Sequence, residues 1–361
     1  MRTAIIAVSR RGIRIAALLK ELYPEADIYV PPRFLSDGEE PNTHLPLHGS
    51  FREALGPLFS GYRLLIFISA AAVAVRAIAS YLQGKDKDPA VVTIDEQVRF
   101  VISLLSGHLG GANAETEKIA RQLNAQPVVT TATDGCGITA FDDLTRRLGW
   151  HIENLGELKK ISAALLEEQE VILYSEKPFQ YPLQGRINLV DSAGQLNKTA
   201  AGVVIISSRL NPLPEPSPPG LPCLLIRPLS IAAGVGCRRG VPAEMIIAII
   251  EEGFRNAGRS LSSLACLATG EFKADEKGLL QAAAYLGVPL KIYTRRQIAG
   301  ALGESVISDF VEEQVGVGAV AEPCARLASD SGEIIMPTRR GKGVTLALAE
   351  VRQLPFSWQN E

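Results

Sequence analysis

Residues 90–132 read AVVTIDEQVRFVISLLSGHLGGANAETEKIARQLNAQPVVTTA, and this stretch decides the fold. Its two Val- and Ile-rich runs, residues 90–94 and 100–105, are separated only by DEQVR, which is too short for a right-handed crossover and suits a hairpin. A glycine-rich loop then leads to an amphipathic segment, residues 112–123, and to a further apolar run from Pro127. The pattern predicts two antiparallel strands, a helix and another strand.

The same alternation extends toward the N-terminus. Apolar runs around residues 3–9, 26–30 and 63–69 alternate with amphipathic segments at 12–22 and 70–82. Strands that are apolar throughout and separated by helices are typical of a buried, mostly parallel sheet. We therefore predict a first α/β domain over residues 1–135.

The remaining chain divides at a proline-rich segment. Residues 136–222 contain one helical pattern and three short strand-like runs, and they end in NPLPEPSPPGLP, which has six prolines in twelve residues and favours an extended linker. A second strand and helix series fills residues 223–361. The predicted fold class is α/β, with two open, mostly parallel α/β domains joined through a small middle α+β domain.

Composition excludes several classes of protein. The 37 Lys and Arg residues nearly balance the 39 Asp and Glu residues, so the chain has no overall attraction for nucleic acid or an anionic membrane. The longest apolar run, Leu64–Val75, is far shorter than the roughly 20 residues needed to cross a bilayer, and no signal-peptide pattern is present. We expect a cytoplasmic protein without nucleic-acid or membrane partners; the oligomeric state is left open.

Metal sites and several common catalytic motifs are also not indicated. The five cysteines are scattered without a CxxC pair, and we expect no metal site. The sequence contains no GxSxG, GxxxxGK[ST] or HExxH motif.

The loop that follows residues 100–105 is the first candidate site. It reads SGHLGGAN from residue 106 to residue 113, at the carboxyl end of a predicted strand, where ligands of open α/β sheets bind. His108 can act as an acid or base near neutral pH, and the glycines let the backbone approach an anionic ligand. The alternative is a glycine-rich helix entry with a solvent-facing histidine. The candidate binding residues in this loop are Ser106, Gly107, Gly110, Gly111 and Asn113.

Other candidate residues follow neighbouring strands. Thr133 and Asp134 come after the run from Pro127, and Asp134 would share a cleft with His108 if the two strands are neighbours. The alternative for Asp134 is an Asp-Gly turn. Arg76 would face the same sheet edge or the solvent.

A second glycine-rich loop, GVGCRRG, occupies residues 234–240. Its glycine spacing is one residue too wide for a dinucleotide-binding fingerprint, and its two arginines suit carboxylate recognition instead. Arg238 and Arg239 are therefore candidate binding residues, with a solvated basic loop as the alternative. We interpret the turn at 338–343 as an ordinary polar hairpin.

Several of these motifs resemble one known family. The run from Asp88 to Asp134, with its SGHLGGAN and TTATD blocks, resembles the N-terminal signature of the CbiG family, the cobalt-precorrin-5A hydrolases of anaerobic cobalamin biosynthesis. GVGCRRG, DEKGL at 275–279, LGVPL at 286–290 and GVGAVAEP at 316–323 resemble blocks of its C-terminal domain. Two positions depart from the family pattern: Val98 stands where a glycine is usual and Thr338 where a lysine is common.

The resemblance implies a reaction and roles for residues. The implied substrate is a cobalt-bearing, carboxylate-rich tetrapyrrole; the enzyme opens its ring-A δ-lactone and releases acetaldehyde, giving cobalt-precorrin-5B. His108 would be the general acid or base, the N–H groups near Gly110 and Gly111 would bind the oxyanion, and Asp134 would orient His108 or handle a second proton. Arg238, Arg239, Glu276 and Glu322 would lie on a substrate-facing surface.

The resemblance also bears on cofactors and partners. It implies no cofactor, because cobalt is carried by the substrate, and it allows transient contact with other corrin-pathway enzymes. The C-terminal domain would act as a lid or as a carrier. A non-catalytic tetrapyrrole-binding or carrier protein remains the alternative function.

Overall fold

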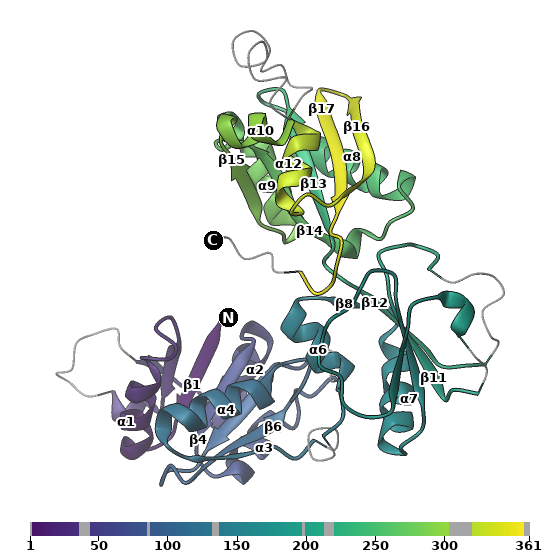
Figure 1. Ribbon diagram of the computed structural model, residues 1–361. Coiled ribbons are helices and arrows are strands. Elements are labelled where there is room, and N and C mark those ends of the chain that lie inside the picture. Colours follow the sequence, from purple (N-terminus) through teal and green to yellow (C-terminus); the bar gives the residue numbers. More distant parts are fainter. Residues whose placement is uncertain are drawn as a thin grey trace. The chain divides into compact units, whose positions relative to one another are not determined.

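The computed structural model describes residues 2–35, 44–84, 87–131, 137–196, 199–212, 220–302 and 320–356. The chain divides into two compact units, Met1–Arg146 and Arg147–Glu361. Among the described residues, the first unit holds one sheet and the second holds two, each with helices packed on it (Figure 1). This confirms the predicted α/β fold class with mixed, mostly parallel sheets.

The sheet of the first unit has seven strands in the order β3-β2-β1-β4-β5-β6-β7. Strands β1 to β5 run parallel, whereas β6 pairs antiparallel with β5, and β7 runs parallel to β6. The predicted hairpin is therefore confirmed. The strands are β1 (Thr3–Ala7), β2 (Asp27–Val30), β3 (Leu45–Pro46), β4 (Leu64–Ile68), β5 (Ala90–Ile94), β6 (Phe100–Leu105) and β7 (Gln126–Val128).

Helices cover both faces of this sheet. Alternate residues of a strand point to opposite faces, so Ile5 and Ile66 pack with α1 and α4, while Ile6 and Leu65 pack with α2 and α3. This two-sided burial explains why the strands are apolar throughout. These helices are α1 (Arg10–Leu19), α2 (Phe51–Gly61), α3 (Ala71–Ile78) and α4 (Ala112–Leu123). The 3-10 turn η1 (Pro32–Phe34) also lies in the first unit, and α6 (Phe141–Leu148) crosses its boundary at Arg146.

The turn between β5 and β6 contains one strained residue. The Asp95 carboxylate accepts the backbone N–H groups of Arg99 at 2.8 Å and Phe100 at 2.6 Å, which fixes a tight turn. Val98 adopts a φ of +59° in that turn, in the left-handed region that β-branched residues avoid. A glycine takes this conformation without steric cost, which gives a physical reason for the glycine usual in the resembling family.

The middle sheet has five strands in the order β10-β9-β11-β12-β8. Four strands are parallel and β8 is antiparallel to β12. One strand differs from the sequence-based expectation: residues 223–227, which we expected to open the third domain, form β12 and complete this sheet. The elements are β8 (His151–Ile152), α7 (Leu155–Leu166), β9 (Val171–Ser175), β10 (Ile187–Val190), η2 (Ala193–Gln195), β11 (Gly202–Ile206) and β12 (Cys223–Arg227).

The third sheet has the order β15-β14-β13-β17-β16. Helices α8 and α9 contribute to the core on one face, and α10 and α12 to the core on the other. Helix α12 lies directly on β13, since a Cβ added at Gly234 would be 1.8 Å from the Ala321 carbonyl oxygen. The elements are β13 (Ile231–Cys237), α8 (Ala243–Asn256), η3 (Leu261–Ser263), β14 (Leu264–Gly270), η4 (Glu271–Lys273), α9 (Lys277–Leu286), β15 (Leu290–Tyr293), α10 (Arg295–Leu302), α12 (Ala321–Ala328), β16 (Glu333–Gly341) and β17 (Val344–Glu350).

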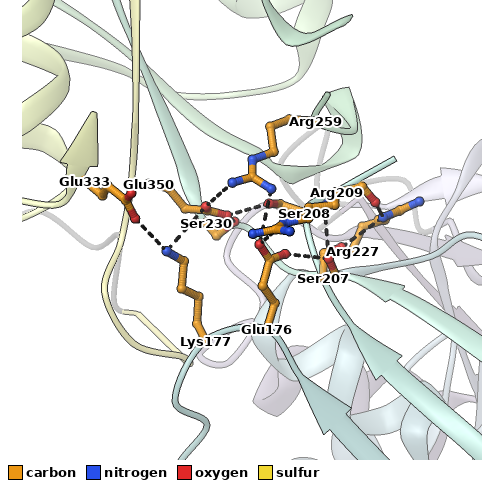
Figure 2. Close-up of polar contacts among 10 residues, drawn as sticks. All are labelled: Glu176, Lys177, Ser207, Ser208, Arg209, Arg227, Ser230, Arg259, Glu333 and Glu350. Carbon is orange, nitrogen blue, oxygen red and sulfur yellow. Dashed lines mark hydrogen bonds and ion pairs between the residues drawn. The ribbon is translucent and has the colours of Figure 1, made fainter. Parts of the chain in front are cut away.

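A buried ionic network joins these two sheets within the second unit (Figure 2). Glu350, only 1% exposed at the end of β17, accepts hydrogen bonds from Ser208 at 2.5 Å and Ser230 at 3.1 Å. Its other carboxylate oxygen lies 3.2 Å from the Arg259 guanidinium and 3.6 Å from the Lys177 ammonium. Because these groups come from segments bordering both sheets, the network holds the two sheets together.

Candidate active site

The glycine-rich loop lies at an unexpected edge of the first sheet. It follows the carboxyl end of β6, as the sequence predicts, but β6 runs opposite to β4 and β5. Leu105 pairs with Val91, near the start of β5, so the loop lies at the amino ends of the parallel strands. The expected position at the carboxyl edge of the main sheet is therefore wrong, because the hairpin reverses the chain.

Two glycines in this loop are required by close contacts. A Cβ at Gly107 would be 2.6 Å from the Asn113 side-chain oxygen. A Cβ at Gly110 would be 2.5 Å from the Ser106 Cβ and 2.8 Å from the Ser106 carbonyl oxygen. Larger residues at either position would force the loop open, because such separations are well inside van der Waals contact.

The backbone of the loop does not support the oxyanion site that we expected at the N–H groups of Gly110 and Gly111. The Gly111 N–H donates to the His108 carbonyl oxygen at 3.0 Å, so it is already engaged within the loop. Gly110 borders a different pocket from the one that His108 lines. The structure therefore does not place the Gly110 and Gly111 N–H groups as an oxyanion site beside His108.

His108 lines an open pocket of about 230 Å³. That volume is below the roughly 300–1,000 Å³ of pockets that enclose a whole drug-sized ligand, so it suits one substituent of a larger molecule. Its walls come from the end of β6, the glycine loop, the segment after β7 and the start of α6. The lining residues are Ser103, Leu104, Leu105, Ser106, Gly107, His108, Leu109, Asn113, Thr130, Thr131 and Asp142.

A chain of polar side chains crosses this pocket. The Ser103 hydroxyl donates to the Asn113 side-chain oxygen at 2.6 Å, and the Asn113 amide donates to the Thr131 hydroxyl at 3.0 Å. Asn113 is buried at the start of α4 and so links β6 to the segment after β7. Ser106, in the same loop, points its hydroxyl to the Asp88 carbonyl oxygen at 3.0 Å and anchors the loop to the chain before β5.

The structure adds an acidic residue that the sequence does not single out. Asp142, in the first turn of α6, lines the pocket with His108. Burial raises the pKa of the Asp142 carboxyl, and the charge of His108 acts in the opposite direction. Acidic residues such as Asp142 and Asp143 are common in the first turn of a helix, where they stabilise the helix dipole. The sequence pattern therefore does not mark Asp142 as a site residue.

The neighbouring Asp143 has a different partner. Its carboxylate pairs with the Arg146 guanidinium at 2.8 Å, on the same helix. Arg146 in turn packs beside Gly111, where an added Cβ would lie 3.5 Å from its Cδ. Helix α6 is thus held against the glycine loop, and this contact brings Asp142 to His108.

Among the residues that the structure describes, the lining of this pocket does not include three of the predicted site residues. Thr133 and Asp134 lie outside the described residues, although Thr131, three positions before Asp134 in the sequence, lines the pocket. Arg76 is exposed on α3 and lines neither this pocket nor the one bordered by Gly110. The roles of Thr133 and Asp134 stay predictions.

In the third sheet, the second glycine loop is held by a buried carboxylate. Glu276 is 7% exposed; it accepts the Gly240 N–H at 2.8 Å and lies 3.7 Å from the Lys273 ammonium. Our expectation that Glu276 lies on a substrate-facing surface is therefore corrected: it points into the protein and fixes the loop.

Arg238 and Arg239, in this loop, are exposed. The Arg238 N–H donates to the Gly343 carbonyl oxygen at 2.9 Å, so the 338–343 turn abuts this loop. Arg239 lies 3.9 Å from Asp275, and both of these side chains are about three-quarters exposed. Both guanidinium groups are thus available to solvent on the surface of the third sheet.

In the part of the chain that the structure describes, Glu322 pairs only within its own helix. It lies in the first turn of α12, 3.9 Å from Arg326 one turn later. An exposed pair of this kind contributes little to stability. The structure does not bring Glu322 together with Arg238 through any contact among the described residues.

Within the described ranges, no three His, Cys, Asp or Glu side chains come together as a candidate metal site. The helices that the structure describes include none long and apolar enough to span a membrane.

Comparisons with known proteins agree with the motifs. Family models described as cobalamin synthesis G N-terminal, cobalamin biosynthesis central region and cobalamin synthesis G C-terminus match residues 53–134, 139–228 and 231–349. The chain is 34% identical over 353 residues to a protein of Salmonella typhimurium named cobalt-precorrin-5A hydrolase, covering 96% of each chain. It is 31% identical over 352 residues to a protein of that name from Priestia megaterium, covering 96% of this chain and 94% of the relative.

A solved structure, a cobalamin biosynthesis protein G homologue from Sulfolobus solfataricus, aligns over 97% of both chains with a TM-score of 0.40 and 19% identity. The family models and the two bacterial relatives cover nearly the whole chain, including both glycine loops. This protein therefore belongs to the CbiG family of cobalamin biosynthesis, as its sequence motifs predicted.

Proposed function

We propose that this protein is a cobalt-precorrin-5A hydrolase, which opens the ring-A δ-lactone of a cobalt tetrapyrrole and releases acetaldehyde to give cobalt-precorrin-5B. Two relatives of that name, at 31% and 34% identity, support the proposal. The observation that carries it is the pocket in which His108 and Asp142 lie among neutral polar side chains. Cobalt belongs to the substrate, and the proposal needs no further cofactor.

The reaction consumes one water and needs proton transfers in both of its stages, lactone opening and C–C cleavage. Water adds to the lactone carbonyl and the ring C–O bond breaks, which leaves a carboxylate and a hydroxyl group. Loss of the hydroxyl proton then lets the adjacent C–C bond break, so the C=O bond of acetaldehyde forms. The electron pair of the broken bond stays on the macrocycle carbon, which takes up a proton.

His108 is the proposed general base for water and the donor of the later proton. A histidine suits both steps because it exchanges protons near neutral pH, and such catalysis contributes about 10²–10⁴-fold to a rate. Ser103, Asn113 and Thr131 supply the hydroxyl and amide groups that surround the lactone carbonyl. Asp134 stays a candidate for the second proton transfer.

Asp142 is the proposed positioning residue for His108. It lines the same pocket, and its carboxylate favours the protonated imidazole that forms when His108 takes a proton. We expect Asp142→Asn to lower kcat about tenfold or more with little change in KM, and Asp142→Glu to restore part of it. Equal kcat values in the wild type and Asp142→Asn would remove Asp142 from this role.

Arg238 and Arg239 are the proposed contacts for acetate or propionate side chains of the macrocycle. Their guanidinium groups are exposed, and guanidinium pairs well with carboxylates in a bidentate geometry. Transient contact with other corrin-pathway enzymes stays a prediction of the family resemblance.

An anaerobic assay with enzymatically prepared cobalt-precorrin-5A tests the reaction. The wild-type protein is expected to release one acetaldehyde per substrate, trapped as a hydrazone, with a matching loss of mass from the tetrapyrrole. Tight binding of intact substrate without acetaldehyde would instead make the protein a tetrapyrrole carrier.

A further inference from the structure

A second pocket adjoins the His108 pocket on the other side of the glycine loop. It has a volume of about 380 Å³, and Leu109 borders both pockets. Its other walls come from the end of α2, the start of β4 and the segment before β5, and they include Ser60, Arg63 and Lys87. Nothing in the proposed lactone chemistry uses this pocket.

The strand pairings explain why cationic residues meet the loop here. Ala90, the first residue of β5, pairs with Leu64, which follows Arg63. The loop after β6 returns to the same edge, and an added Cβ at Gly110 would lie 3.2 Å from the Ala90 nitrogen. Because β6 runs antiparallel to β5, the candidate catalytic loop that follows β6 lies at the sheet edge where Arg63 precedes β4.

The charge of this second pocket is positive. Arg63 and Lys87 are exposed, and within the ranges that the structure describes neither has a carboxylate partner. Asp88 also lines this pocket, but it is buried and its carboxylate accepts the backbone N–H groups of Gln83 at 2.9 Å and Gly84 at 3.2 Å. Two unpaired cations over a polar wall favour an anionic group of a ligand.

We propose that this second pocket binds a carboxylate side chain of the same molecule whose lactone enters the His108 pocket. The inference rests on the proposed function, because it takes a macrocycle with several acetate and propionate arms as the ligand. A ligand that lies across Leu109 can place one substituent in each pocket. Arg63 and Lys87 then determine which carboxylate arm is accepted and so set the orientation of the macrocycle.

Steady-state kinetics of the full chain with cobalt-precorrin-5A test the site. We expect Arg63→Met/Lys87→Met to raise KM about tenfold or more and to leave kcat within about twofold, because removing a charge-assisted hydrogen bond to the ligand weakens binding by about tenfold. Lys87→Arg, which keeps the charge, should stay near the wild-type KM. Arg14→Met removes an exposed cation on α1 that lines neither pocket and is the matched control.

A binding titration separates this inference from the proposed reaction. Uroporphyrin III, a macrocycle with eight carboxylates, is titrated by its visible absorption against the wild type, the double variant and the Arg14→Met control. Weaker binding to the double variant alone, with a difference that shrinks at high salt, supports the site even if no acetaldehyde is released. Equal affinity for all three proteins, together with an unchanged KM, overturns the site and leaves the proposed reaction untouched.

Discussion

At the scale of single residues, two ionisable side chains line the pocket, and the sequence singles out only one of them as a candidate. His108 stands out because it is one of four histidines and follows a strand in a glycine-rich loop. Asp142 could not be distinguished in the same way, because it reaches the pocket only through the packing of α6 against that loop. A residue whose role depends on a tertiary contact leaves no periodic signal in the sequence.

Val98 provides a test of local strain. Its φ of +59° costs about 1–2 kcal/mol for a β-branched residue, and glycine removes that cost while losing a partly buried side chain. We therefore expect Val98→Gly to be nearly neutral. Val288→Gly, at a partly buried valine outside the left-handed region, should destabilise its sheet by about 2 kcal/mol.

Hydrogen–deuterium exchange of peptides from the two sheets measures both variants. The amides of residues 90–105 should keep their protection in Val98→Gly, whereas those of residues 282–290 should exchange faster in Val288→Gly. Equal loss of protection in the two variants would show that Val98 is not strained.

Gly110 provides a test of the loop. Because its added Cβ would lie 2.8 Å from the Ser106 backbone oxygen, Gly110→Ala must displace the loop that carries His108. We expect kcat to fall at least tenfold in the acetaldehyde assay, since small misplacements of catalytic groups are costly. Gly156→Ala, where nothing lies within 4 Å of the added Cβ, should keep wild-type activity.

At the scale of elements, the strands and helices of the first sheet were predictable because their burial is periodic. Residues 90–94 and 100–105 form the predicted hairpin, and residues 112–123 form the predicted helix. The sequence did not predict which sheet edge the loop reaches. Because β6 is antiparallel to β5, the carboxyl end of β6 lies at the amino ends of the parallel strands. It also assigned residues 223–227 to the wrong sheet, since an apolar strand after a proline-rich segment fits either neighbour.

Glu276 and Lys273 provide a test of how the second glycine loop is held. Removing one partner of a buried ion pair leaves an uncompensated charge, which costs about 3–5 kcal/mol. We expect Glu276→Gln to speed amide exchange in residues 238–241, because the neutral amide leaves the Lys273 ammonium unpaired and accepts the Gly240 N–H more weakly than the carboxylate does. Adding Lys273→Met should recover part of that protection, and additive effects of the two changes would contradict a coupled pair.

At the scale of the whole molecule, the second unit is held together by charged groups that are largely out of water. Glu350, Arg259 and Glu176 connect segments bordering the middle and third sheets, as Figure 2 shows. Burying these charges is costly unless each is paired, so we expect the network to favour the arrangement of the two sheets in which the charges stay paired.

The Glu176 carboxylate makes this network sensitive to acid. Burial alone raises its pKa, but the Ser207 hydrogen bond and the charges of Arg259 and Arg209 together hold the pKa of Glu176 below its usual value. Because the pKa of Glu176 is lower in the folded protein than in the unfolded chain, its ionised carboxylate stabilises the fold. This stabilisation is complete when the pH is above the unfolded-state pKa of about 4.3, and it is lost as the pH falls through the folded-state pKa.

Thermal unfolding between pH 7 and pH 3 measures this effect. We expect Glu176→Gln to lower the Tm at pH 7 and to make the loss of stability below about pH 4.3 less steep than in the wild type. Glu251→Gln, at an exposed carboxylate on α8, is the control and should follow the wild-type profile. A Glu176→Gln profile parallel to that of the wild type would contradict the proposed linkage.

We propose that cobalt-precorrin-5A reacts in the His108 pocket. Single-turnover release of acetaldehyde, measured with wild-type and His108→Ala protein in excess over substrate, tests it most directly. We expect stoichiometric release by the wild type and a rate about 10²–10⁴-fold lower for His108→Ala, with substrate binding and Tm unchanged. Equal rates for the two proteins would contradict it and would place the chemistry elsewhere in the chain.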